Sequence, residues 1–300
     1  MENLKLVYDF TFAELAVKFF ETGDDVYLHK ISETGATGHI FNHATHFGNQ
    51  MPKNSKLELV THLLSPLDKQ KEKLPYFKRN LDFAKKSIAE TRFSEKIALQ
   101  YLPKGFSFSG SIFFTFGYDI GVAYGNNCSV NLANPIFADS MTEIKYYAIH
   151  EIHHAGFIAI RNGHMPSLDI TTRGEMAQII EYLTHLEGMG TYAALGIREQ
   201  EGAMTARDDL LGDYVALQDQ KLMEGFEEEY FNIYYHFKNY PDSPITEEDW
   251  HKIHILSNGK RLWYRVGAKM AGEIDRKMGR EKLTDLISRP FEDFIHAYQL

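Results

Sequence analysis

The sequence predicts an α+β fold that is mostly helical, with a small mixed sheet preceding a pair of long helices. Apolar residues recur at helical spacing in several segments of the first hundred residues. Residues 106–133 are instead rich in aromatic and β-branched side chains separated by glycines, which is typical of strands. After Pro135 the helical spacing returns and continues to the C-terminus. The expected order is therefore helices, a small sheet, and then helices.

Four helices are expected before the sheet. In the first of them Phe12, Ala16 and Phe19 share one face, and Asn54 or Ser55 can cap the third. The expected ranges are 11–31, 35–48, 54–64 and 76–92. Three strands are expected to follow, over 106–116, 121–124 and 129–133. With 300 residues the chain is long enough for one large or two small domains. We expect a helical N-terminal region over 1–100 and a second region over 101–300, which can also form one continuous domain.

The most informative segment is His150–His154, which reads HEIHH and matches the pattern H-E-x-x-H. Two histidines four residues apart lie on one face of a helix, where both imidazoles can bind one Zn²⁺. Glu151 lies one step round the helix and can reach a metal-bound water as a general base. The surrounding residues favour a helix of about five to six turns that stops at Asn162-Gly163. The alternative is a helix whose histidines only pack in the core.

A zinc ion held by two histidines needs a third protein ligand, and a second helix expected over 173–195 offers several. Its candidates in order of preference are Glu187, Glu181 and His185, with Glu175 as a further acidic residue. Glu187 is preferred because apolar residues flank it and because Gly188 and Gly190 follow. Glycine in a helix costs roughly 1 kcal/mol against alanine, so this pair predicts a close approach by another backbone. We expect the H-E-x-x-H helix to be that neighbour.

These two segments together resemble the gluzincin pattern, in which a helix with E-G follows the H-E-x-x-H helix. The closer resemblance is to uncharacterised bacterial and archaeal families described as predicted Zn-dependent proteases, which add a C-terminal Y-x-x-G helix. Here Glu187-Gly188 and Tyr264–Gly267 match these segments, and the resemblance covers roughly residues 105–295. It implies a zincin-like fold, one Zn²⁺ per chain with His150, His154 and Glu187 as ligands, and Glu151 as base. His153 is outside the ligand set of such families.

The resemblance also implies where a substrate binds. In zincins an edge strand just before the metal helix holds an extended peptide by main-chain pairing. Ser129–Asn134 stands at that position, with Asn131 and Ala133 as candidate substrate-binding residues; the alternative is an ordinary inner strand. The oxyanion needs a donor from outside the motif. The candidates are Tyr192, Tyr264, His251 and His254. Tyr264 is preferred because the Y-x-x-G segment would bring it to the cleft. Arg261 and Arg265 are instead candidates for binding a substrate carboxylate.

The predicted function is a zinc-dependent metallopeptidase that hydrolyses peptide bonds through a zinc-bound water activated by Glu151. Two alternatives stay open: a metal-binding protein without peptidase activity, and a zinc hydrolase of a non-peptide amide. The expected partner is a peptide or small protein. His39 and His43 are also four residues apart, but no acidic residue lies near them, so packing or lining the substrate cleft is favoured over a second metal site.

Composition favours a cytoplasmic enzyme. The net charge of −9 gives no basic surface for nucleic acid. Cys128 is the single cysteine, which excludes an intrachain disulfide. The first residues lack the basic and apolar segments of a secretory signal, and no run of 18 apolar residues predicts a membrane span. The sequence leaves the oligomeric state undetermined.

Overall fold

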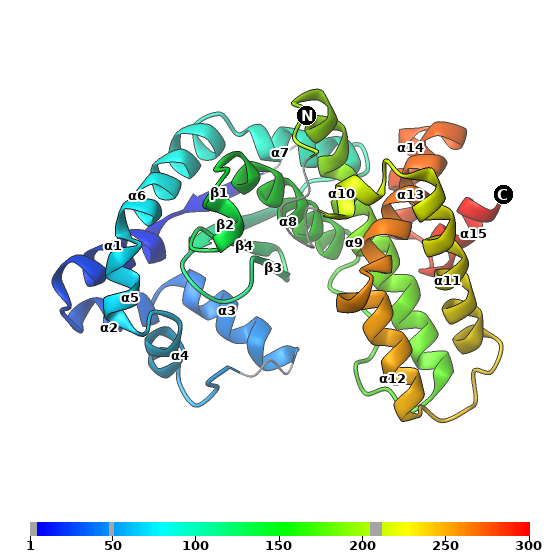
Figure 1. Ribbon diagram of the computed structural model, residues 1–300, viewed down its shortest axis with the longest axis horizontal. Coiled ribbons are helices and arrows are strands. Elements are labelled where there is room, and N and C mark those ends of the chain that lie inside the picture. The colour runs from blue at the N-terminus through cyan, green and yellow to red at the C-terminus, as the bar shows by residue number, and fades with distance from the viewer. Residues whose placement is uncertain (1–4, 48–50, 205–211) are drawn as a thin grey trace. The chain divides into compact units, whose positions relative to one another are not determined.

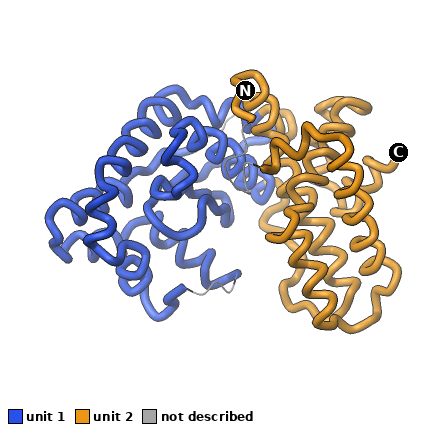
Figure 2. The backbone as a smooth tube through the Cα atoms, viewed as in Figure 1, with its two compact units in different colours: residues 1–99, 105–159 blue, residues 100–104, 160–300 orange. Residues whose placement is uncertain are grey.

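The computed structural model describes residues 5–47, 51–204 and 212–300 of the chain. The chain forms two units, coloured separately in Figure 2. Unit 1 consists of residues 1–99 and 105–159, and unit 2 of residues 100–104 and 160–300. The sheet and the H-E-x-x-H helix therefore belong with the N-terminal helices.

A mixed four-stranded sheet forms the centre of unit 1, in the order β1-β2-β4-β3. The strands are β1 (Lys5–Asp9), β2 (Ser109–Thr115), β3 (Gly121–Tyr124) and β4 (Asn127–Asn131). β2 pairs in parallel with both β1 and β4, whereas β3 pairs antiparallel with β4. The three expected strands are present, but β1 was missed: the sheet begins at the N-terminus and not after the first helices. Five residues with a single apolar alternation are too short a pattern to be identified alone.

Helices surround this sheet in unit 1 (Figure 1). They are α1 (Thr11–Thr22), α2 (Val26–Ser32), α3 (Gly35–His46), α4 (Lys56–Leu63), α5 (Leu67–Glu72), α6 (Leu74–Phe83), α7 (Phe93–Ala98) and α8 (Thr142–Ile160), with a π-helical turn at Ala84–Ala89. The single helix expected over 11–31 is two helices, because Gly23 adopts φ +70° and ends α1. Ser55 caps α4 as expected, with its hydroxyl accepting from the Glu58 amide.

Aromatic side chains join the N-terminal helices to the sheet. The rings of Phe20 on α1 and Phe77 on α6 both lie close to Phe116, at centroid distances of 6.2 and 4.8 Å. All three side chains are almost completely buried. Burial of each ring stabilises the folded state by about 2–3 kcal/mol, and these contacts hold α1 and α6 against the sheet.

α8 packs in the same unit and carries the H-E-x-x-H motif. The Ser94 hydroxyl of α7 donates to the Lys145 carbonyl of α8 at 2.9 Å. The helix ends at the predicted stop, where Asn162 and Gly163 both adopt positive φ, +51° and +72°. Glycine, which has no Cβ, and asparagine enter that region at little cost, so these two residues end the helix.

Unit 2 is helical. Its long helices α9, α11 and α13 run side by side (Figure 1). The helices are α9 (Arg173–Gln200), α10 (Gly212–Ala216), α11 (Gln220–Lys238), α12 (Glu247–His254), α13 (Leu262–Met278), α14 (Arg280–Asp285) and α15 (Glu292–Gln299), with a π-helical turn at Ile255–Gly259. Thr172 and Glu175 form a capping box that begins α9. Among the residues that the structure describes, no helix is long and apolar enough to span a membrane.

Two glycines allow α9 and α13 to cross closely. A Cβ placed on Gly188 would lie 2.4 Å from the carbonyl carbon of Gly267, and one on Gly267 would lie 2.5 Å from the Thr184 carbonyl oxygen. The close approach predicted at Gly188 is therefore confirmed, but the neighbour is α13. The expectation that the H-E-x-x-H helix is this neighbour was wrong, because the Y-x-x-G segment supplies the matching glycine.

Candidate metal and catalytic site

The two outer histidines of the motif lie together on α8. The ring centroids of His150 and His154 are 4.2 Å apart, and the ring planes meet at 68°. One helical turn separates the two residues, which accounts for their proximity. His150 is partly exposed and His154 is buried. One imidazole is thus reachable from solvent while the other is held by packing.

Glu187 of α9 completes a group of three possible metal ligands. One ligand atom each from His150, His154 and Glu187 lies within 4.8 Å of the other two. A search of the described part of the chain for three or more His, Cys, Asp or Glu side chains close enough to share an ion finds this group. Two imidazoles and one carboxylate are a donor set of catalytic zinc sites, which keep a further position for water or substrate. The chemistry of these donors therefore fits zinc.

The other candidates on α9 have different surroundings. Glu181 is buried and accepts hydrogen bonds from the Tyr234 hydroxyl at 2.8 Å and from Lys238 Nζ at 2.7 Å. His185 is fully buried, and its ring stacks on Phe294 with centroids 4.2 Å apart. Burial, with a smaller contribution from Arg161, lowers the pKa of His185 to about 3. Neither residue joins the three-ligand group.

Glu151 lies on the side of α8 that faces the sheet. A Cβ placed on Gly121 of β3 would lie 2.5 Å from Glu151 Oε1 and 2.6 Å from its Cγ. The negative charge of Glu151 also acts on Cys128 of β4: burial first, and then this charge, raise the pKa of the thiol well above 9.0. Glu151 itself is only 4% exposed. The carboxylate is therefore confined against β3 and β4, and it needs a neighbour without a side chain at Gly121.

The strand order corrects the expected substrate edge. Asn131 ends β4, which pairs with β2 on one side and with β3 on the other. The Asn131 amide donates to the Ile120 carbonyl, and its side-chain oxygen accepts from the amides of Gly117 and Ala133. Asn131 was therefore wrongly expected on an edge strand, and Ala133 lies beyond the end of β4. The alternative, an inner strand, is correct, because the short β3 adds to the sheet outside β4.

The remaining histidines of the two motifs pack in the interior or against aromatic rings. His153 is fully buried and contacts the ring of Phe157. His39 of α3 lies with Nε2 3.3 Å from the Val122 carbonyl oxygen, and burial lowers its pKa to about 4. His43 Nδ1 lies 2.8 Å from the Tyr118 hydroxyl. These contacts agree with the packing role that was favoured over a second metal site.

Tyr264 lies in the first turn of α13, next to two arginines. The guanidinium of Arg261 stacks on its ring, 3.7 Å from the centroid. Arg261 in turn donates from Nε to Asp213 of α10 at 2.8 Å. Asp213 is nearly completely buried. The sequence did not predict this burial, because a single aspartate outside any motif looks like an ordinary surface residue. The contact between Gly121 and Glu151 was likewise not predicted, because a single glycine in a strand has no distinctive sequence pattern.

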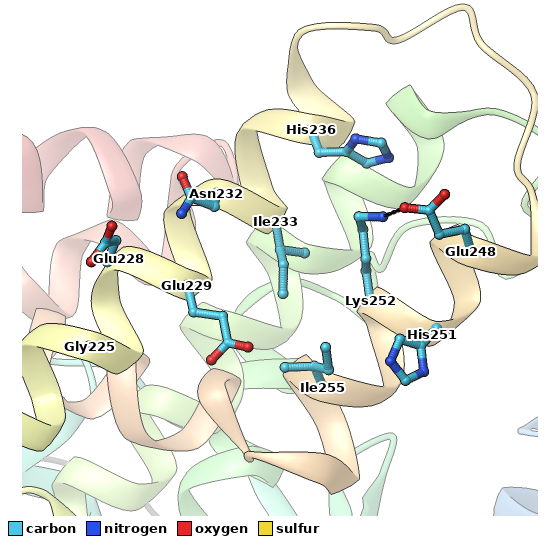
Figure 3. Close-up of a pocket in the computed structure, with 10 residues that line it drawn as sticks. All are labelled: Gly225, Glu228, Glu229, Asn232, Ile233, His236, Glu248, His251, Lys252 and Ile255. Atoms are coloured by element: carbon cyan, nitrogen blue, oxygen red, sulfur yellow. Dashed lines mark hydrogen bonds and ion pairs between the residues drawn. The ribbon is translucent and has the colours of Figure 1, made fainter.

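A cavity of about 510 Å³ lies between α11 and α12 (Figure 3). Ile233 and Ile255 form its apolar wall, and charged side chains surround it. Three of these charges are paired: Lys252 with Glu248, and Glu229 with Lys260, which lies outside the cavity lining. The cavity contains none of the three possible metal ligands.

Comparison with known proteins identifies a family. The family model described as "Putative zinc dependent peptidase (DUF5700)" matches residues 40–300, which include both motif helices and α13. Comparisons with curated proteins and with solved structures give no match to this chain. The resemblance to Zn-dependent protease families that the two motifs indicated is confirmed by this match. The chain therefore belongs to the DUF5700 family.

Proposed function

We propose that this protein is a zinc metallopeptidase of the gluzincin type, in which His150, His154 and Glu187 hold one zinc ion. The observation that carries the proposal is the meeting of three ligand atoms within 4.8 Å. They come from the two ends of an H-E-x-x-H motif and from a glutamate 33 residues later in the chain. The description of the family as a zinc-dependent peptidase supports the same function.

Glu151 is the general base in this proposal. When bound, zinc supplies Lewis-acid chemistry to the scissile carbonyl and the attacking water. The Glu151 carboxylate removes a proton from that water and delivers it to the departing amine. Its burial beside Gly121 supports this role, because a carboxylate confined in one place is ready for proton transfer. A site that only binds metal has no use for a base next to its ligands.

β3 is the strand on which we place the substrate. It is the last strand of the sheet on the β4 side. The hydrogen bond from the Asn131 amide to the Ile120 carbonyl shows which residues near β3 form hydrogen bonds with β4. Since hydrogen-bonded and non-hydrogen-bonded pairs alternate in antiparallel ladders, the main-chain groups of Gly121 and Ala123 point away from β4. An extended peptide paired with them would run past Glu151, which packs on Gly121.

Tyr264 is our proposed donor to the oxyanion that forms as the carbonyl is attacked. Its ring is held by the stacked Arg261 guanidinium, so its hydroxyl needs little reorganisation. Of the other donors on the long helices, Tyr192 is committed elsewhere, because its hydroxyl donates to Asp275 at 2.8 Å. A conserved-volume test is Tyr264→Phe, which removes the hydroxyl and leaves the stacking partner in place.

The decisive experiment incubates the zinc-loaded protein with a mixed peptide library and identifies the products by mass spectrometry. Glu151→Gln, which keeps the size of the side chain, is the matched control. Cleavage by the wild type and none by Glu151→Gln supports the peptidase. If the wild type binds zinc and cleaves no peptide, the protein is a metal-binding protein or acts on another amide, and the proposed function fails.

A further inference from the structure

In unit 1, α3 and Glu151 of α8 lie on opposite faces of the sheet beside β3. Phe113 of β2 and Val122 of β3 pair with the same residue of β4, so their side chains share a face. The ring of His39 on α3 lies 5.5 Å from that of Phe113, which places α3 on this face. Gly121 is one residue along β3 and faces the other way, where Glu151 packs on it.

A peptide paired with the outer edge of β3 would follow the same alternation. Its successive side chains point to opposite faces of the sheet, as in any strand. Those level with Gly121 and Ala123 face Glu151, whereas those level with Val122 and Tyr124 face α3. Every second side chain of the peptide therefore meets α3, so this helix is the element that can select among them.

Five rings form a continuous row on the α3 side of β3, which we call the aromatic row. Its members are Tyr118, His43, Phe47, His46 and Tyr124. Successive ring centroids lie 4.6 to 5.7 Å apart, the spacing of aromatic rings in contact. Tyr124 belongs to β3 itself, and His46 and Phe47 are exposed. The row thus extends from α3 to the strand on which we place the substrate.

The centre of the aromatic row is neutral. Burial, with smaller contributions from His39 and His46, lowers the pKa of His43 to about 4. The Nδ1 atom of His43 lies 2.8 Å from the Tyr118 hydroxyl, which is a neutral partner. A neutral imidazole between aromatic rings offers ring surface to a ligand and no charge for an ion pair. An aromatic side chain therefore suits this surface better than an acidic one.

The turn between β2 and β3 holds one end of the aromatic row in place. Tyr118 adopts φ +75° in this turn, a left-handed conformation that is strained for a residue with a bulky side chain. Its ring packs against the buried cluster of Ile40, Leu59 and Leu63. Strain of this kind persists only where the surrounding packing compensates it. The row is therefore preorganised, and a ligand that packs on it loses little affinity to ordering of the protein.

We propose that an aromatic side chain of the substrate packs on His46 and Tyr124 of the aromatic row, so that the enzyme selects peptides by this side chain. The inference rests on the proposed peptidase function and on β3 as the strand that pairs with the peptide. The contact removes apolar area from water and adds offset or edge-to-face ring packing. Because the peptide alternates between the two faces, its positions directly before and after the aromatic one do not meet the row.

The test measures kcat/KM for peptides of one sequence in which phenylalanine or alanine occupies each position near the scissile bond in turn. For the wild type we expect phenylalanine to be favoured by about 10- to 100-fold at one position, or at two positions two residues apart. His46→Ala should lower this preference by about 2- to 10-fold, the range for one aromatic contact. His46→Phe, which keeps a ring, should retain the preference.

The matched control is His29→Ala, which removes an exposed histidine from α2 of the same unit and should leave the preference unchanged. A preference that His46→Ala does not lower overturns the inference. An effect of His46→Ala at two adjacent positions of the peptide overturns it as well, since only one of them can face α3. Loss of the preference in His46→Phe would mean that the imidazole and not the ring surface selects the substrate, which also contradicts the proposal.

A binding experiment separates this inference from the peptidase function. Zinc-loaded Glu151→Gln is titrated calorimetrically with the same peptides, with and without His46→Ala. Tighter binding of a phenylalanine peptide that weakens with His46→Ala supports the aromatic site even if the wild type cleaves no peptide. Cleavage by the wild type with no dependence on His46 in either experiment overturns the aromatic site and leaves the peptidase function in place. Absence of any peptide binding overturns the aromatic site.

Discussion

Glu151 packs directly against the backbone of Gly121, so closely that a Cβ on this glycine would lie 2.5 Å from Oε1 of the glutamate. The neighbouring atom belongs to the flexible end of a side chain, so a substitution here displaces the carboxylate and leaves the strand in place. Gly121 is not in the positive-φ region, and alanine suits its backbone. A substitution at Gly121 therefore tests the placement of the proposed base, Glu151, without a loss of fold stability.

Gly121→Ala should lower kcat by roughly 100-fold, the effect of moving a catalytic group by about 1 Å, while zinc content stays unchanged. The measurements are steady-state kinetics and metal analysis on the same preparation. Gly225→Ala is the control, because a Cβ there meets nothing within 4 Å. Full activity in Gly121→Ala would mean that Glu151 does not work from this position.

Glu151→Gln should keep about one zinc per chain and lose turnover by about 10²- to 10⁴-fold, because an amide cannot accept the proton of the attacking water. Metal analysis and peptide cleavage measure the two effects separately. Loss of the metal in this variant would instead make Glu151 a ligand and contradict its assignment as base.

His150→Ala and Glu187→Gln should each weaken zinc binding, since each removes one of three donors. Competition with a chromogenic chelator gives the affinity. Glu181→Gln is the matched control on α9: its carboxylate is bound to Tyr234 and Lys238, so this variant should lose stability and retain zinc. Zinc loss in Glu181→Gln with none in Glu187→Gln would reverse the ligand assignment.

Gly188→Ala should destabilise unit 2, because the added methyl would meet the Gly267 backbone at 2.4 Å and α9 and α13 would have to separate. Overpacking of this kind costs about 1–3 kcal/mol, against a gain of about 1 kcal/mol from helix propensity. Urea unfolding measures the change in free energy. Gly225→Ala, in an open position of α11, should gain up to about 1 kcal/mol. Equal effects in the two variants would contradict the close crossing.

Stability should fall as the pH is lowered from 6.5 towards 3, in part through His185. Burial, followed by Arg161, lowers the pKa of this imidazole from 6.5 to about 3. Between these values the unfolded chain binds a proton that the folded chain does not, so the free energy of unfolding decreases by at most about 1.4 kcal/mol per pH unit for this group. His185→Leu should show a smaller dependence on pH in urea unfolding between pH 4 and 7. An unchanged slope would show that folding does not lower the pKa of His185.

Local sequence patterns predicted much of the candidate site. The spacing of His150 and His154 depends on helix periodicity alone, and Asn162-Gly163 ends that helix through its backbone preference. The choice of Glu187 over its neighbours on α9 followed from its apolar flanks and the glycine after it, and the structure groups Glu187 with the two histidines. These features depend on residues that are close together in the chain. The geometry of a single helix fixes their relative positions, whatever the tertiary fold.

Tertiary structure decided the strand order, the helix crossing and the ion-pair cluster on Asp213, because each of these depends on which distant segments of the chain meet. Pairing β1 with β2 brings together residues 5–9 and 109–113, and placing β3 outside β4 moved the sheet edge from Asn131 to Gly121. The same is true of Gly188, whose partner Gly267 is 79 residues away in sequence. Asp213 of α10 and the two arginines that donate to it at the start of α13, Arg261 and Arg265, likewise come from different helices. The periodicity of a helix or strand shows which of its faces is apolar. Only the packing of the folded chain determines which other element covers that face.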